Sequence, residues 1–255
     1  MANLQTRAAL SAYGTYYTVN GQKTWTTLAH IAHWMFCLTR TQSTGVKQEG
    51  ITFLLIPMND PGVTVKPIIT LGGSHSVNDV FLTDVKVPIE NRIGEEGKGW
   101  TYAKGLLIHE RTGLAGIQNS VLGLAKARQN ALSVRVGRGT LMDVPAFRNK
   151  MGALEAELSA LEFTELRSLA SVAAGGNPGP ESSIMKLKGT EIQQRISELN
   201  LEAAGVYAAV WGASAGPGFA RGATSAYLGA RATTIFGGAS EVQKDVIAKN
   251  VLGLG

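Results

Sequence analysis

The chain contains 255 residues, of which 44% are hydrophobic and 17% are charged. This composition supplies enough apolar material for one or two folded domains and excludes an intrinsically disordered chain. The net charge of +5 is too small, and the basic residues are too dispersed, to favour a nucleic-acid-binding protein, although the charge suits an anionic ligand such as a phosphorylated cofactor. No apolar run in the sequence is long enough to predict a membrane span.

Cys37 is the only cysteine in the sequence, which excludes an internal disulfide and any zinc site built from cysteines. It lies in the apolar segment 34–38, so we interpret it as a small buried hydrophobic residue. The first seven residues do not have the pattern of a secretory signal, and the sequence predicts a cytoplasmic protein.

The first 95 residues are predicted to form β-strands. Segments 16–19 and 22–25 flank Asn20-Gly21, a dipeptide typical of a two-residue hairpin turn. Several short strands separated by turn residues are typical of a small β-barrel or β-sandwich. The further strands expected in this part of the chain are 34–40, 50–56, 63–69 and 80–87.

The pattern changes to a helical one after Pro88. Apolar residues then recur at steps of three and four, which predicts helices with a core-facing stripe. Because short connections separate these helices, we expect an up-down four-helix bundle over residues 96–255, after a β-domain over residues 1–95. The fold class expected is therefore α+β and multidomain. The four helices expected are 99–136, 145–174, 181–204 and 222–251, the last with a glycine break at 237–238.

Glu110 is a candidate general base because it lies in an otherwise apolar, glycine-rich helical segment. Burial of a carboxyl group raises its pKa, and a carboxylate that accepts protons near neutral pH is suited to general-base catalysis. The alternative is a partly exposed glutamate that pairs with a nearby arginine or lysine, since structural ion pairs also shift pKa values.

Other polar and glycine-rich features leave alternatives open. His30 and His33 are three residues apart, but no third ligand lies at a suitable spacing, so a metal site is not favoured. The glycine pairs at 72–73 and 237–238 are either simple turns or sites where backbone N–H groups bind a phosphate or an oxyanion. Trp25 is either a core aromatic residue or part of a binding surface.

Five segments carry a recognisable pattern in chain order. They are NGQKTWTT at 20–27, GVTVKPI at 62–68, DVFLTDVKVP at 79–88, GEEGKGW at 94–100 and TIFGGASEVQ at 234–243. Together they resemble the acyl-CoA dehydrogenase family over nearly the whole chain. The resemblance implies a middle β-domain and a C-terminal four-helix bundle that enclose FAD. It also implies that the family's N-terminal helical domain is absent from this chain.

The resemblance assigns roles to residues in both halves of the chain. It implies that Trp25 packs beside the flavin ring and that Thr27 forms a hydrogen bond near the flavin N5. Arg111 matches a residue that helps to place the chain of coenzyme A.

Further matches concern the rest of the FAD molecule. Ala239 and Glu241 match positions at its adenine end, although Ala239 lacks the hydroxyl group that many members have. Arg135 is matched to an arginine that reaches the FAD pyrophosphate of a neighbouring subunit. Its surroundings do not reproduce the usual Arg-x-x-Phe-Gly, and Arg138 is an equal candidate.

The main departure from the family pattern is Gly237, where most members have the catalytic glutamate. A minority, which resembles isovaleryl-CoA dehydrogenase, has the base at the position of Glu110, directly before an arginine. The pairing of Glu110-Arg111 with Gly237 is the one expected of that minority. The resemblance therefore implies Glu110 as the catalytic base, and the backbone N–H of Gly237 can still polarise the thioester oxygen.

The function implied is FAD-dependent dehydrogenation of an acyl-CoA to trans-2-enoyl-CoA. The partners implied are an electron-transfer flavoprotein as electron acceptor and further copies of the chain in a homodimer or homotetramer. Two alternatives remain: a non-catalytic or half-site subunit beside a homologous partner subunit, and a flavin-dependent monooxygenase on the same fold.

Overall fold

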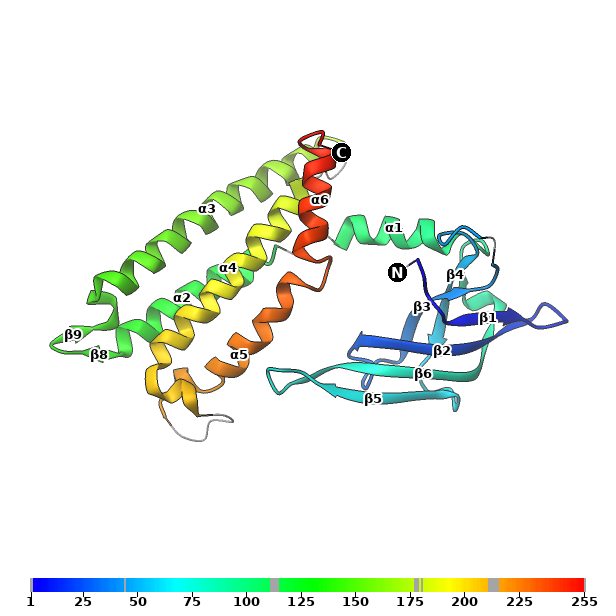
Figure 1. Ribbon diagram of the computed structural model, residues 1–255, viewed down its shortest axis with the longest axis horizontal. Coiled ribbons are helices and arrows are strands. Elements are labelled where there is room, and N and C mark those ends of the chain that lie inside the picture. The colour runs from blue at the N-terminus through cyan, green and yellow to red at the C-terminus, as the bar shows by residue number, and fades with distance from the viewer. Residues whose placement is uncertain are drawn as a thin grey trace. The chain divides into compact units, whose positions relative to one another are not determined.

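The computed structural model describes residues 2–43, 45–110, 115–176, 179, 181–210 and 216–254, except for the side chains of residues 107–110. The chain divides into two compact units, Met1–Leu107 and Ile108–Gly255. The first unit contains the seven-stranded sheet, and the second contains most of the helices and a short two-stranded hairpin (Figure 1). The division into domains 1–95 and 96–255 stays a prediction.

The first unit is built on one mixed sheet. Its strands follow the order β5-β6-β2-β1-β3-β4-β7, and all neighbours are antiparallel except β1 and β3. The strands are β1 (Arg7–Leu10), β2 (Tyr16–Thr27), β3 (Trp34–Arg40), β4 (Ile51–Pro57), β5 (Val63–Ile69), β6 (His75–Pro88) and β7 (Arg92–Ile93).

The sheet packs around an apolar core because alternate side chains of its strands point to one side. Tyr17 and Val19 of β2 are fully buried, as are Leu54 and Ile56 of β4. They belong to one cluster with residues of β3 and β6, including Cys37. The predicted strands at 34–40, 50–56, 63–69 and 80–87 are confirmed, and so is the buried position of the only cysteine.

The predicted hairpin at Asn20-Gly21 is wrong. Strand β2 runs through both residues, and its pairing with β6 shifts register between Val19 and Gly21. Gly21 has a φ of +145°, and a Cβ atom at this position would lie 2.7 Å from the Cα of Thr6 on the neighbouring chain segment. The glycine therefore permits a β-bulge and a close approach of two strands. Because glycine is also favoured in hairpin turns, the sequence alone does not distinguish these cases.

The helical part contains more and shorter helices than the sequence predicts. Helices 145–174 and 181–204 are confirmed as α3 (Pro145–Ala173) and α4 (Glu181–Ala204). The segment 99–136 instead holds two helices, and the segment 222–251 is interrupted by a 3-10 turn at Arg231–Thr234. The remaining helices are α1 (Gly99–Glu110), α2 (Ile117–Ser133), α5 (Ala223–Ala230) and α6 (Ser240–Asn250).

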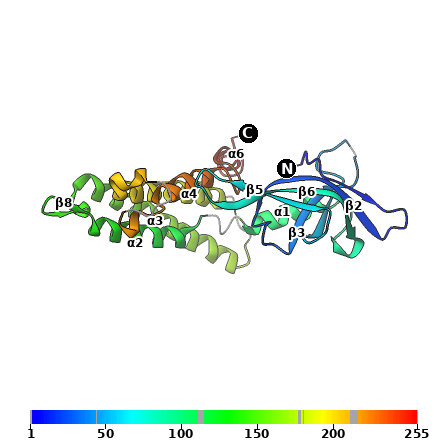
Figure 2. The same ribbon diagram turned by 90° about the horizontal axis from the view of Figure 1, so that it is seen from below.

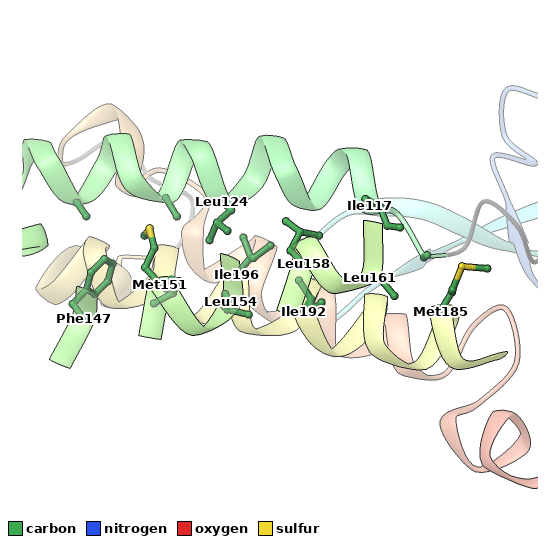
Figure 3. Packing of buried hydrophobic residues seen from close by; sticks show 14 residues of the cluster. Ile117, Leu124, Phe147, Met151, Leu154, Leu158, Leu161, Met185, Ile192 and Ile196 are labelled. Carbon is green, nitrogen blue, oxygen red and sulfur yellow. The ribbon is translucent and has the colours of Figure 1, made fainter. Parts of the chain in front are cut away.

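The core of the second unit lies between α2, α3 and α4 (Figure 3). Buried residues of α3 follow spacings of four and three, which keeps one stripe of the helix against its neighbours. These residues are Phe147, Met151, Leu154, Leu158 and Leu161. Helices α5 and α6 pack on α4, so the predicted α+β class, a β-domain followed by a helical bundle, is confirmed. None of the helices in the described parts of the chain is both long and apolar enough to cross a membrane.

Candidate active site

A cleft of about 690 Å³ opens in the first unit beside the C-terminal end of β2. Both Trp25 and Thr27 line it, together with residues of β3. Trp25 is 64% exposed, so it is not a core residue. The structure thus brings the two predicted flavin-contacting residues of the first unit to one concave surface.

The backbone at Trp25 has an unusual conformation. Its φ is +60°, in the left-handed region that side chains other than glycine seldom adopt. The pairing of β2 with β6 shifts register between Lys23 and Thr26, so Trp25 lies in a second β-bulge of the same strand. Bulges redirect side chains and occur often beside active sites. The bulge therefore accounts for the exposure of an aromatic residue within a strand.

The inner wall of the cleft contains Lys23 and Cys37. Lys23 donates a hydrogen bond from Nζ to the carbonyl oxygen of Leu38, at 2.7 Å. Burial raises the pKa of the Cys37 thiol to about 11, against the opposing effect of the Lys23 charge. The thiol is thus protonated near neutral pH, which makes Cys37 a packing residue and not a nucleophile.

The second unit carries Gly237, Ala239 and Glu241 on one short loop and the first turn of α6. The φ values of Gly237 and Gly238 are +65° and +96°, which favour glycine at both positions. Ala239 is the N-cap residue of α6 and makes no side-chain capping bond. Alanine has no hydroxyl group with which it could form such a bond.

Two buried polar side chains hold this loop. Lys186 of α4 is 1% exposed, and its Nζ donates hydrogen bonds to the carbonyl oxygens of Thr233 at 3.1 Å and of Gly238 at 2.7 Å. The Nε2 of Gln243, which is also buried, donates to the carbonyl oxygen of Gly238 at 3.3 Å. A Cβ atom on residue 238 would lie 2.3 Å from that Nε2. The path of the loop before α6 is therefore determined by α4 and by α6 itself.

The buried Lys186 predicts a pH-dependent stability. Desolvation lowers its pKa below the usual 10.5, against the opposing charge of Glu241. Between the two pKa values the unfolded chain binds more protons than the folded chain, so the contribution of Lys186 to the free energy of unfolding rises with pH in this range. We expect Lys186→Met to lose this rise and the exposed-site control Lys188→Met to keep it. Urea unfolding at several alkaline pH values measures both, and equal slopes in the two variants would contradict the prediction.

Arg135 and Arg138 lie elsewhere in the second unit. Strands β8 (Arg135–Val136) and β9 (Gly139–Thr140) form a hairpin between α2 and α3. The hairpin is at the opposite end of this unit from α6 (Figure 1 and Figure 2). Both arginines are exposed, and Arg135 donates from Nη2 to the carbonyl oxygen of Arg138 at 3.4 Å. The structure therefore does not bring Arg135 together with Ala239 and Glu241 within one chain.

The predicted base falls outside what the structure describes. Glu110 is the last residue of α1, but its side chain lies outside the described part of the chain, as does the whole of Arg111. Their roles stay predictions.

Comparisons with known proteins give the family of the chain. Residues 97–252 match the family "Acyl-CoA dehydrogenase, C-terminal domain", and residues 1–85 match "Acyl-CoA dehydrogenase, middle domain". The first match alone covers more than half of the chain. The chain belongs to the acyl-CoA dehydrogenase family. Members of this family are FAD-dependent flavoprotein oxidoreductases.

Individual acyl-CoA dehydrogenases support this assignment. The acyl-CoA dehydrogenase IpdE1 of Mycobacterium tuberculosis is 31% identical over 100% of this chain and 63% of its own length. The mitochondrial short-chain specific acyl-CoA dehydrogenase of Homo sapiens is 29% identical over 94% of this chain and 57% of its own length. The chain therefore spans less than two thirds of the length of these relatives.

Solved structures agree with the fold. The ChsE4-ChsE5 complex from Mycobacterium tuberculosis contains a chain that matches with a TM-score of 0.86 and 31% identity, over 100% of this chain and 65% of that one. The Tcur3481-Tcur3483 steroid ACAD matches with a TM-score of 0.84 and 25% identity, over 100% of this chain and 64% of that chain. The middle β-domain and helical domain of acyl-CoA dehydrogenases are both present in this chain.

Two buried polar residues near the candidate site were not predicted from the sequence. Asn78 donates a hydrogen bond to the carbonyl oxygen of Thr26, which lines the cleft, and Lys186 holds the loop before α6. Asn78 points to the same buried side of β6 as Val80 and Leu82. Lys186 lies on the buried face of α4, next to Met185. In each case the available signal was a polar residue on a face otherwise made of buried residues.

Proposed function

We propose that this chain takes part in the FAD-dependent dehydrogenation of an acyl-CoA thioester to trans-2-enoyl-CoA. The observation that supports this most directly is the cleft of about 690 Å³ on which the exposed Trp25 and Thr27 converge. Its size is within the range of about 300–1,000 Å³ typical of cofactor and ligand sites. The donor set also fits a flavin, since an exposed indole offers a stacking face and a threonine hydroxyl offers a hydrogen bond.

FAD, when bound, supplies the acceptor for the hydride that leaves the β-carbon of the substrate. In this proposal Trp25 and Thr27 hold the flavin ring. Ala239 and Glu241 hold the adenine end, and Arg135 or Arg138 reaches the pyrophosphate of a neighbouring subunit. The separation of the β8–β9 hairpin from α6 within the second unit is compatible with a contact across subunits.

In the proposed reaction Glu110 is the base that removes the proton. Its carboxylate takes the proton from the α-carbon of the thioester, and the electron pair left behind forms the new double bond as the β-hydrogen departs as hydride. The backbone N–H of Gly237 donates a hydrogen bond to the thioester oxygen, where negative charge develops. Arg111 helps to place the chain of coenzyme A. Lys186 and Gln243 support this arrangement because they hold the carbonyl groups of the Gly237-Gly238 loop.

The proposal is tested by adding acyl-CoA without oxygen to the purified protein and recording the visible absorption band of the flavin. We expect this band to bleach, and to return when an electron-transfer flavoprotein is added as acceptor. If acyl-CoA leaves the band unchanged, while reduced flavin and oxygen are consumed with a substrate, the monooxygenase alternative replaces the dehydrogenase.

A second candidate is a subunit of a heteromeric acyl-CoA dehydrogenase. Two observations favour it: the similarity to a chain of the ChsE4-ChsE5 complex, and glycine at position 237, where most family members have the base. Co-expression with a homologous chain distinguishes the two candidates. Flavin bound only when both chains are present supports the heteromer, whereas flavin bound and reduced by substrate in this protein alone contradicts it.

A further inference from the structure

Asn78 is a fully buried polar residue of β6 that lines a second cleft, and this cleft shares Ala29 and Trp34 with the candidate flavin cleft. Its Nδ2 donates a hydrogen bond to the carbonyl oxygen of Thr26 at 3.0 Å. The same Nδ2 lies 3.2 Å from Nδ1 of His30, and Oδ1 lies 2.7 Å from Nε2 of His75. The two imidazole rings stack on each other with centroids 4.0 Å apart. One amide therefore joins the end of β2 to two other segments.

The chemistry of the contacts determines how the amide is oriented. A carbonyl oxygen only accepts hydrogen bonds, so the group that faces Thr26 has to be the NH2 group of Asn78. The Oδ1 atom then accepts the N–H of His75 at Nε2, and His30 accepts at Nδ1. Each polar atom of the Asn78 side chain is thus used, as expected for a buried amide.

The bond to Thr26 lies directly after the strained residue of the bulge. Trp25 has a φ of +60°, and the register of β2 on β6 shifts between Lys23 and Thr26. Strained backbone persists only where the surrounding structure holds it, and such positions gather at functional sites. The Asn78 side chain holds the carbonyl of the residue that follows Trp25 and precedes Thr27.

We propose that Asn78 is a positioning residue that maintains the bulge and thereby sets the indole of Trp25 against the cleft. His75 and His30 keep the amide in its orientation. The inference rests on the proposed function only where it concerns flavin binding. The placement of Trp25 itself is independent of any cofactor.

The test uses two variants of Asn78 and a matched control. Asn78→Ala removes the whole amide, whereas Asn78→Asp keeps its shape and the acceptor for His75 but places an oxygen against the carbonyl of Thr26. Asn20→Ala is the control, because Asn20 bridges Asp84 at the other bulge of the same strand pair and does not line the cleft. It removes an asparagine from the same strand pair without touching Trp25.

The readout is the indole N–H signal of Trp25 in NMR spectra of the 255-residue chain, which has four tryptophans. Trp25→Phe assigns the signal, and the signal of Trp100 serves as an internal reference for folding. We expect the Trp25 signal to move or split in both Asn78 variants and to stay unchanged in Asn20→Ala. A folded Asn78→Asp variant with an unchanged Trp25 signal overturns the proposal, because the amide is then only a packing group.

A second variant keeps the test decisive if neither Asn78 variant folds. His75 is exposed, so His75→Ala removes the hydrogen-bond partner of Oδ1 with little effect on the core. We expect a smaller displacement of the Trp25 signal, and an unchanged signal then overturns the proposal.

Flavin binding separates this inference from the proposed function. We expect the affinity for FAD to fall about tenfold in Asn78→Asp, as for the loss of one hydrogen bond that orients the site. If the Trp25 signal moves but the unaltered protein binds no FAD, the positioning role stands and the proposed function fails. If FAD binds equally well to both proteins and the Trp25 signal does not move, the positioning role fails and the proposed function stands.

Discussion

Replacing Glu110 by glutamine is expected to slow the reduction of the flavin by acyl-CoA about 10²–10⁴-fold, the usual contribution of a general base. Glutamine has nearly the same shape as glutamate but cannot accept the α-proton, so FAD should stay bound while reduction slows. Rapid mixing of the protein with acyl-CoA, followed by the visible flavin absorbance, measures the rate directly.

The control for this variant is Glu90→Gln. Glu90 is an exposed carboxylate in the 3-10 turn Ile89–Asn91, so its replacement removes the same charge without affecting the candidate site. We expect this protein to reduce its flavin at the original rate. If Glu110→Gln also keeps the original rate, the proton acceptor is another group and the role of Glu110 is wrong. If both variants slow the reaction equally, the loss of one negative charge is the cause, and not the loss of a base at position 110.

Phe147→Ala is expected to lower the free energy of unfolding of the helical unit by about 3–5 kcal/mol. Phe147 is fully buried near the N-terminal end of α3, in the cluster that α2, α3 and α4 share (Figure 3). Truncation to alanine removes the apolar contacts of the ring and leaves a cavity that the surrounding helices fill only in part. Urea unfolding followed by the helical circular dichroism signal gives the change as a lower midpoint with an unchanged slope.

Phe163→Ala is the matched control, since Phe163 lies on the same helix but is 69% exposed. The same substitution at this exposed position should change the free energy of unfolding by no more than about 0.5 kcal/mol. Equal losses in the two variants would mean that the helical unit does not depend on the core between α2, α3 and α4, and would contradict the packing described here.

Local periodicity was enough to predict most of the elements. The apolar runs at 34–40 and 50–56 predict two strands, and steps of three and four residues predict α3 and α4. These patterns succeed because burial on one face requires the same spacing whatever the neighbouring element is. The family was also accessible from sequence, since its motifs are distributed in order over nearly the whole chain.

The arrangement of the candidate site depended on the tertiary structure. Asn20-Gly21 has the composition of a turn but lies in a bulge, because β2 pairs with β1 on one side and β6 on the other. Trp25 is directed to the cleft by a second bulge, which Asn78 supports from another strand. Lys186 similarly holds a loop some fifty positions along the chain. The sequence by itself determined most of the strands and helices and the family to which the chain belongs. Strand register and the partners of buried polar groups were decided only in the folded chain, because both depend on contacts between residues that are distant in sequence.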